Sequence, residues 1–151
     1  MKILLISDSH GNKKTLSEFL QKSTYDFAFF LGDGVRDVDG FDQNKVKRVC
    51  GNCDFFSSEA VTRFENLANK KFMLTHGHDY RAKLTTGLML EKAKQNFCDV
   101  VCFGHTHLQS NQKLDGILFV NPGAFKNGDY AILEIDQNGT ISVFLKNLKN
   151  N

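Results

Sequence analysis

The chain has 151 residues, of which 41% are hydrophobic and 24% charged, and its formal net charge is +2. This length predicts a single domain, residues 1–151, and the composition is that of an ordinary globular protein. The charge is too small to indicate nucleic-acid or membrane-surface binding, and no apolar run approaches the ~20 residues of a membrane-spanning helix. The N-terminal residues predict a strand rather than an export signal, so we expect a cytoplasmic protein.

The first half of the chain alternates short apolar runs with one amphipathic segment. Almost continuous apolar character is typical of strands that are buried on both faces. Leu16, Phe19 and Leu20 recur at helical spacing. The predicted elements are strands at 2–7, 25–31 and 46–50, a helix at 12–23, and a loop with one helical turn within 34–45. This βαβ order indicates parallel strands.

The second half adds antiparallel pairs. Asn138-Gly139 is the strongest type of short hairpin signal, and Ala68-Asn69 predicts another tight turn. The predicted elements are strands at 59–67, 70–75, 100–103, 117–120, 130–135 and 140–145, and a helix at 84–97. Roughly ten strands are too many for one sheet in so short a chain. We therefore expect an α/β fold of two packed mixed β-sheets flanked by helices, with the site beyond the strand C-termini.

Polar side chains able to bind metal follow five of the predicted strands. They occur in Asp8-x-His10, Gly32-Asp33, Gly51-Asn52-Cys53-Asp54, His76-Gly77-His78 and Gly104-His105-Thr106-His107. Residues i and i+2 of an extended segment point to the same side, so His105 and His107 can present two imidazoles together. Each motif alone is most simply structural, but their joint occurrence indicates a metal site. The mixture of carboxylate, imidazole and amide suits Mn, Fe or Zn better than Ca or Mg.

In this order the motifs resemble those of the calcineurin-like metallophosphoesterase superfamily, whose pattern is D-x-H, G-D, G-N-H-D/E, H-G and G-H-x-H. The resemblance extends from Lys2 to about Leu145. The short chain and the G-N-C-D variant are most similar to the small prokaryotic phosphodiesterase branch, which also carries a match to Asn121-Pro122-Gly123. The resemblance implies a four-layer α-β-β-α sandwich.

The resemblance also implies two divalent metal ions, with Mn favoured and Ni, Fe or Zn as alternatives. The first ion would be held by Asp8, His10 and His107, the second by Asn52, His76 and His105, and both by a bridging Asp33. The implied reaction is phosphodiester hydrolysis by in-line attack of a metal-bridging hydroxide on phosphorus.

Four further residues are candidates for catalysis or substrate binding. Cys53 stands where many family members have the histidine that protonates the leaving group, and Asp54 would orient that histidine. Cys53 is a weak acid, a neighbour of the phosphate, or only a filler of that space. His78 matches no invariant ligand, and Arg36 replaces an aspartate common in the family. Both are candidate substrate contacts, although surface roles explain them equally well or better.

Several alternatives stay open. A phosphomonoesterase or nucleotide phosphatase would use the same ligands. The resemblance also includes a eukaryotic trafficking subunit that uses this fold as a protein-binding scaffold, but all seven ligand positions here keep coordinating side chains. A redox pair of Cys50 and Cys53 is a third reading, and Cys98 and Cys102 are expected in the core. We expect a small phosphoester substrate, no nucleic-acid or membrane partner, and hairpin strands that permit a homodimer.

Overall fold

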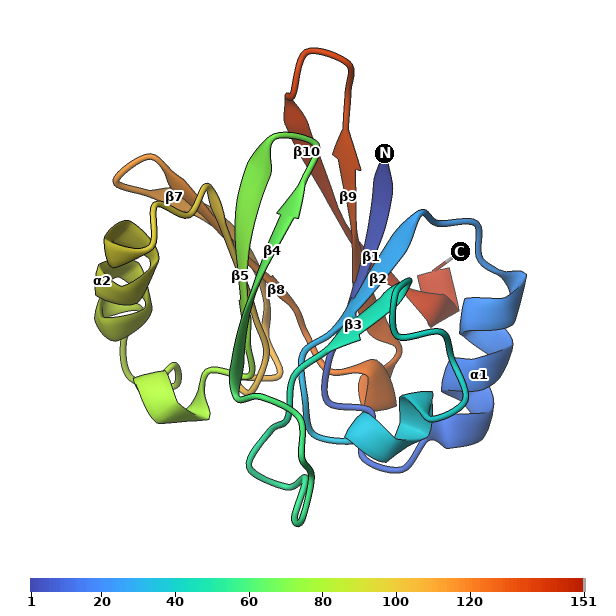
Figure 1. Cartoon of the computed structure of the whole chain (residues 1–151). Coiled ribbons are helices and arrows are strands. Elements are labelled where there is room, and N and C mark those ends of the chain that lie inside the picture. Colours follow the sequence, from blue (N-terminus) through green and yellow to red (C-terminus); the bar gives the residue numbers. More distant parts are fainter. Residues whose placement is uncertain (151) are drawn as a thin grey trace.

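The computed structural model describes residues 1–150 and contains two five-stranded sheets packed face to face (Figure 1). The first sheet is formed by β1 (Lys2–Ile6), β2 (Phe27–Phe30), β3 (Val46–Arg48), β9 (Asp129–Ile135) and β10 (Ile141–Asn147). The second sheet is formed by β4 (Thr62–Leu67), β5 (Lys70–Thr75), β6 (Val100–Phe103), β7 (Gln109–Leu114) and β8 (Ile117–Pro122).

Each sheet contains a group of three parallel strands. The strand orders are β10-β9-β1-β2-β3 and β4-β5-β6-β8-β7. Strands β1, β2 and β3 pair in parallel, as do β5, β6 and β8, while every other pairing is antiparallel. The C-terminal ends of both parallel groups lie at the lower edge of Figure 1, so the loops that follow them meet there.

The core between the sheets is built from alternate residues of the central strands. Ile3 and Leu5 of β1 share this core with Phe29 of β2 and Phe72 of β5. The Phe29 and Phe72 rings meet edge to face, with centroids 5.5 Å apart and an interplanar angle of 71°. The contact is one of those that pack the two sheets against each other.

Helices cover the outer faces and complete four layers (Figure 1). Helix α1 (Lys13–Lys22) buries Leu16 and Leu20 against Leu4 and Ile6 of β1. Helix α2 (Gly87–Gln95) buries Met89 and Ala93 against the second sheet. Burial of β1 on both faces explains its continuous apolar run. Short 3₁₀ helices are η1 (Val35–Val38), η2 (His78–Tyr80), η3 (Phe125–Asn127) and η4 (Leu148–Asn150).

The structure confirms the predicted fold class and both predicted turns. Ala68 and Asn69 have φ values of 49° and 58°, as a tight hairpin turn requires. Strand β7 was not predicted, because its sequence QSNQKL is polar and it lies at a sheet edge with little burial. The two α-helices are shorter than predicted by one to three residues at each end, a usual uncertainty for helix termini.

All four cysteines are free, and only Cys53 is exposed. Burial raises the pKa of the Cys102 thiol, which keeps it protonated in the core.

Among the described residues, no helix has both the length and the hydropathy needed to cross a bilayer. The homodimer stays a prediction.

Candidate metal centre

The five motifs meet where the loops after β1, β2, β3, β5 and β6 converge. Asp8 and His10 follow β1, Asp33 follows β2, and two histidine-containing loops enter from the second sheet. Candidate metal-binding side chains from both sheets therefore come together between the sheets.

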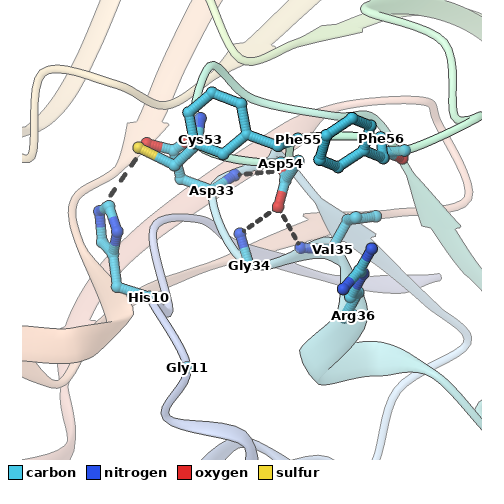
Figure 2. Close-up of a pocket in the computed structure, with 11 residues that line it drawn as sticks. His10, Gly11, Asp33, Gly34, Val35, Arg36, Cys53, Asp54, Phe55 and Phe56 are labelled. Carbon is cyan, nitrogen blue, oxygen red and sulfur yellow. Dashed lines mark hydrogen bonds and ion pairs between the residues drawn. The ribbon is translucent and has the colours of Figure 1, made fainter.

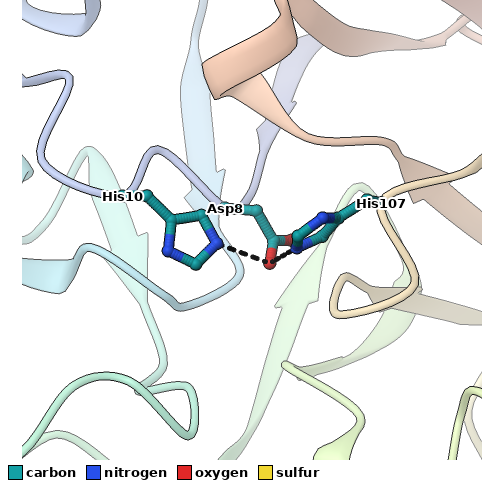
Figure 3. Close-up of side chains that lie close together, drawn as sticks. All are labelled: Asp8, His10 and His107. Carbon is teal, nitrogen blue, oxygen red and sulfur yellow. Dashed lines mark hydrogen bonds and ion pairs between the residues drawn. The ribbon is translucent and has the colours of Figure 1, made fainter.

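The first cluster combines Asp8, His10 and His107 (Figure 3). The His107 Nε2 lies 3.0 Å from the Asp8 Oδ1, and the His10 Nε2 lies 3.7 Å from the same oxygen. The Asp8 side chain is fully buried, whereas both imidazoles are partly exposed. These three residues are the ligands predicted for the first ion, and the structure brings them together.

The second cluster combines Asp33 and His76 with Asp8. The His76 Nε2 lies 3.4 Å from the Asp33 Oδ2 and 3.9 Å from the Asp8 Oδ1. The other ring nitrogen, Nδ1, lies 2.7 Å from the Leu31 carbonyl oxygen. Because a carbonyl oxygen can only accept a hydrogen bond, Nδ1 must be the donor. This contact leaves Nε2 as the ring nitrogen available to a metal ion. That atom is buried and has no hydrogen-bond partner among the described residues.

His105 and Asn52 lie beside this cluster without joining it directly. The His105 ring centroid is 5.0 Å from that of His76, and its backbone N–H donates to the Asp8 Oδ2 at 3.1 Å. The exposed Asn52 amide contacts the Cys53 sulfur at 3.3 Å. The coordinating roles of His105 and Asn52 stay predictions.

The electrostatics of the centre follow from its buried carboxylates. Burial opposes ionisation of Asp33, but the nearby His76 imidazole and the hydrogen bond from the Cys53 backbone N–H outweigh it and lower the pKa of that carboxyl well below its usual range. Burial also opposes charge on His76, yet Asp33 and Asp8 raise the pKa of that imidazole. Burial and the neighbouring His76 lower the pKa of His105 to about 4, so its imidazole is neutral at pH 7.

Backbone strain is concentrated at the candidate ligands. Five of the seven have left-handed φ values: Asp8 (55°), His10 (47°), Asp33 (56°), His105 (68°) and His107 (60°). Such conformations are uncommon for residues other than glycine, and strained backbone of this kind clusters at functional sites. The chain thus accepts an unfavourable backbone at these positions to aim the side chains inward.

Close backbone approach tightens the site further. A Cβ on Gly104 would lie 1.9 Å from the Ser7 Oγ and 2.9 Å from the Asp8 Oδ2. A Cβ on Gly51 would lie 2.2 Å from the Asp33 Oδ1. Both glycines therefore let a ligand-bearing loop pack directly against a carboxylate.

Cys53 and Asp54 lie at a pocket of about 500 Å³ that opens beside the clusters (Figure 2). The Cys53 sulfur groups with His10 and Asp33, since their ligand atoms all lie within 4.8 Å of one another. Partial burial and the Asp33 carboxylate raise the pKa of the Cys53 thiol.

The Asp54 carboxylate organises backbone. It accepts four backbone N–H hydrogen bonds at 2.7–2.8 Å, from Asp33, Gly34, Val35 and Gly51. It thereby ties the loop after β3 to the loop after β2. The catalytic role predicted for Asp54 stays a prediction.

The two predicted substrate contacts lie on different sides of the centre. Arg36 lines the pocket together with Cys53 (Figure 2). His78 lies near the second cluster, with its ring centroid 5.5 Å from that of His76 and its Nε2 3.3 Å from the Asp79 carboxylate. Its buried Nδ1 has no hydrogen-bond partner among the described residues.

Sequence reasoning missed two supporting interactions. The buried Asp37 accepts hydrogen bonds from the Ser9 hydroxyl at 2.6 Å and the Gly11 N–H at 2.8 Å, and so holds the Asp8–His10 loop. The buried Asn121 amide donates to the Gly104 carbonyl at 2.9 Å and holds the loop that carries His105 and His107. The only sequence signal for Asp37 is its position: it directly follows Arg36, which stands where the family commonly has an aspartate.

The residues present fit divalent cations. Asp8 and Asp33 are buried carboxylates that pair with no lysine or arginine among the described residues. Their neighbours are imidazoles, including the unpartnered His76 Nε2. Buried charges are normally paired or bound to metal, and this set of oxygen and nitrogen donors suits Mn, Fe or Zn.

Comparison with known families agrees with this geometry. Residues 1–138 match the model of the calcineurin-like phosphoesterase superfamily domain. The chain belongs to this superfamily. Metallophosphoesterases use divalent metal ions, and the Asp and His clusters of this chain are groups that could bind them.

Two curated relatives support the assignment. The chain is 30% identical over 144 residues to a probable metallophosphoesterase, YsnB, from Bacillus subtilis, covering 90% of this chain and 85% of that protein. It is 28% identical to the phosphodiesterase YfcE of Escherichia coli, covering 97% and 93% of the two chains.

Solved structures support the fold. A predicted phosphoesterase from Streptococcus pneumoniae superposes with a TM-score of 0.77 at 24% identity, covering 96% of this chain and 97% of that one. Vps29 of Entamoeba histolytica complexed with zinc superposes with a TM-score of 0.72 at 18% identity, covering 97% and 99%.

The Asp54 hydrogen bonds generate the first prediction. Asp54→Ala removes the acceptor of four backbone N–H groups, so we expect the free energy of unfolding to fall by about 2–4 kcal/mol. Metal affinity should fall as well, because the Asp54 carboxylate no longer ties the loop after β3 to the Asp33 backbone. Urea denaturation and metal titration measure the two effects.

Asp136→Ala is the matched control. Asp136 accepts N–H bonds from Asn138 and Thr140, both at 2.8 Å, in the β9–β10 hairpin at the opposite end of the sheet. Its loss should reduce stability without changing metal affinity. Unchanged metal affinity in Asp54→Ala would show that Asp54 does not position the centre.

Proposed function

We propose that this protein is a binuclear metal-dependent phosphodiesterase that hydrolyses its substrate by in-line attack of hydroxide on phosphorus. One observation supports this most directly: two buried carboxylates, Asp8 and Asp33, face imidazoles from both sheets beside an open pocket. Membership of the superfamily and a phosphodiesterase among the curated relatives point to the same reaction.

The ligands divide into two sets that share a carboxylate. Asp8, His10 and His107 would hold one ion, and His76, His105 and Asn52 the other, with Asp33 contacting both. Divalent cations bound there would lower the pKa of water and neutralise charge on phosphoryl oxygens. We favour Mn, with Ni, Fe or Zn as alternatives.

The chain's own groups hold this arrangement in place. The Leu31 carbonyl fixes the His76 ring, and the Cys53 N–H donates to the Asp33 Oδ1 at 2.8 Å. The Asp8 Oδ2 accepts from the His105 backbone at 3.1 Å, which leaves Oδ1 directed at His107. Each carboxylate thus uses one oxygen for backbone and keeps the other toward the imidazoles.

Metal content tests the binuclear proposal. Seven candidate ligands are too many for one ion that must keep an open position. After reconstitution with Mn in a non-chelating buffer, elemental analysis should approach two equivalents per chain. Saturation at one equivalent or none would contradict the proposal, and absence of both metal and hydrolysis would favour the scaffold alternative.

Asp33→Asn tests the shared carboxylate. The substitution removes the charge that both ions would share, so we expect turnover of bis(p-nitrophenyl) phosphate to fall at least about 100-fold while the fold persists. Turnover, metal content and a circular dichroism spectrum are measured together, with Asp136→Asn as the control that keeps activity. Near-normal activity in a metal-loaded Asp33→Asn protein would exclude the bridging role.

Cys53 generates the third test of this site. A general acid contributes roughly 10²–10⁴-fold with poor leaving groups, but a thiol of reference pKa ~8.5 releases its proton less readily than an imidazolium near 6.5. We therefore expect good activity on aryl phosphodiesters and slow hydrolysis of alkyl monoesters. Cys53→Ser should cost less than about threefold on aryl diesters.

Rates across a series of leaving groups decide the role of Cys53. A loss of several hundredfold on poor leaving groups alone, with unchanged metal content, would identify Cys53 as the acid. The same panel separates a diesterase from a phosphomonoesterase or nucleotide phosphatase, which would prefer monoesters.

A further inference from the structure

Two aromatic side chains project from the loop between β3 and β4 at the mouth of the pocket. Phe55 is 72% exposed and Phe56 is 100% exposed. Neither ring has an aromatic contact among the described residues. Phe56 also has a left-handed φ of 63°, an uncommon conformation for a bulky residue. Folding therefore gains little from either ring.

The loop that carries the two rings is held on both sides. Before them, Asp54 is held by its four backbone hydrogen bonds. After them, Glu59 lies 3.6 Å from the buried Arg48, and its carbonyl accepts a hydrogen bond from the Cys50 thiol at 3.1 Å. The rings are thus presented by a braced loop rather than by an unsupported one.

The rings and the candidate metal ligands line the same pocket. His10 and Asp33 are among the residues that line it, and so are Phe55, Phe56 and Arg36 (Figure 2). Arg36 is exposed and forms no ion pair with any described residue. Apolar rings and an unpaired cation therefore adjoin the place where phosphate would bind.

From this arrangement we propose that Phe55 and Phe56 form a specificity subsite that binds a planar aromatic ester group of the substrate. Arg36 attracts the anionic part of the same molecule. The inference rests on the proposed phosphodiesterase function and names its substrate class: phosphodiesters that carry a nucleoside or another aryl group. Stacking on a phenyl ring does not depend on the identity of the stacked ring. A nucleoside base and another aryl group would therefore be recognised in the same way.

Product-like phosphates test the subsite without depending on turnover. Each of phenyl phosphate, methyl phosphate and thymidine 5′-monophosphate has one ester group, and calorimetric titration of the Mn-loaded protein gives their affinities. We expect phenyl phosphate to bind at least about fivefold more tightly than methyl phosphate. In Phe55→Ala/Phe56→Ala this ratio should fall below about two.

Phe97→Ala is the matched control. Phe97 is 87% exposed, has a φ of 54° and follows α2, outside the pocket, so its loss should leave every affinity unchanged. If the double variant weakens thymidine 5′-monophosphate as much as phenyl phosphate, nucleosides are a source of the ring. If it weakens phenyl phosphate alone, the source is a smaller aryl group.

Two results would overturn the subsite. One is an equal affinity of the wild type for phenyl and methyl phosphate, and the other is a ratio that the double variant does not change. A change of oligomeric state in the double variant, with phosphate affinities unaltered, would place the rings in a protein interface instead. Hydrolysis of bis(p-nitrophenyl) phosphate by the wild type separates these failures from failure of the proposed function.

Discussion

The structure depends on the burial of two carboxylates, Asp8 and Asp33, within 4.8 Å of each other. Like charges near 4 Å repel by about 4 kcal/mol at an effective dielectric of ~20, and no basic side chain among the described residues compensates them. Backbone N–H groups and imidazoles supply part of the compensation. Bound cations would supply the rest, so the ordinary rule for buried charge explains why the ends of both sheets converge on this point.

The same constraint explains where the backbone is strained. The loops that follow β1, β2 and β6 turn sharply at the candidate ligands, where Asp8, Asp33 and His105 have left-handed backbone conformations. Asp37, Asp54 and Asn121 hold these turns through hydrogen bonds to the loops. Several polar side chains in this region therefore serve to hold the loops in place.

The fold class could be predicted from the sequence because it depends on local patterns, and the same patterns predict that the candidate ligands gather at one edge of the sheets. A buried parallel strand has a continuous apolar run, and the site of such a sheet follows its strands, so Asp8, Asp33 and His76 stood out. Partners chosen in three dimensions were not readable: Ser9 and Asp37 are 28 residues apart and look like ordinary loop residues. Strand β7 was missed for a related reason, since an exposed edge strand needs no apolar pattern.

The loop after β3 shows how the centre and the pocket depend on each other. Within four residues it carries a candidate ligand, Asn52, the anchoring Asp54 and the exposed Phe55. The Asp54 carboxylate accepts a hydrogen bond from the backbone of Asp33, the candidate bridging ligand. Any displacement of the loop therefore moves Asp33 together with Phe55, which lines the pocket. A substitution that alters the aromatic wall without touching Asp54 can therefore change which ester is bound while leaving the metal ligands in place, and this separates substrate choice from the chemistry at phosphorus.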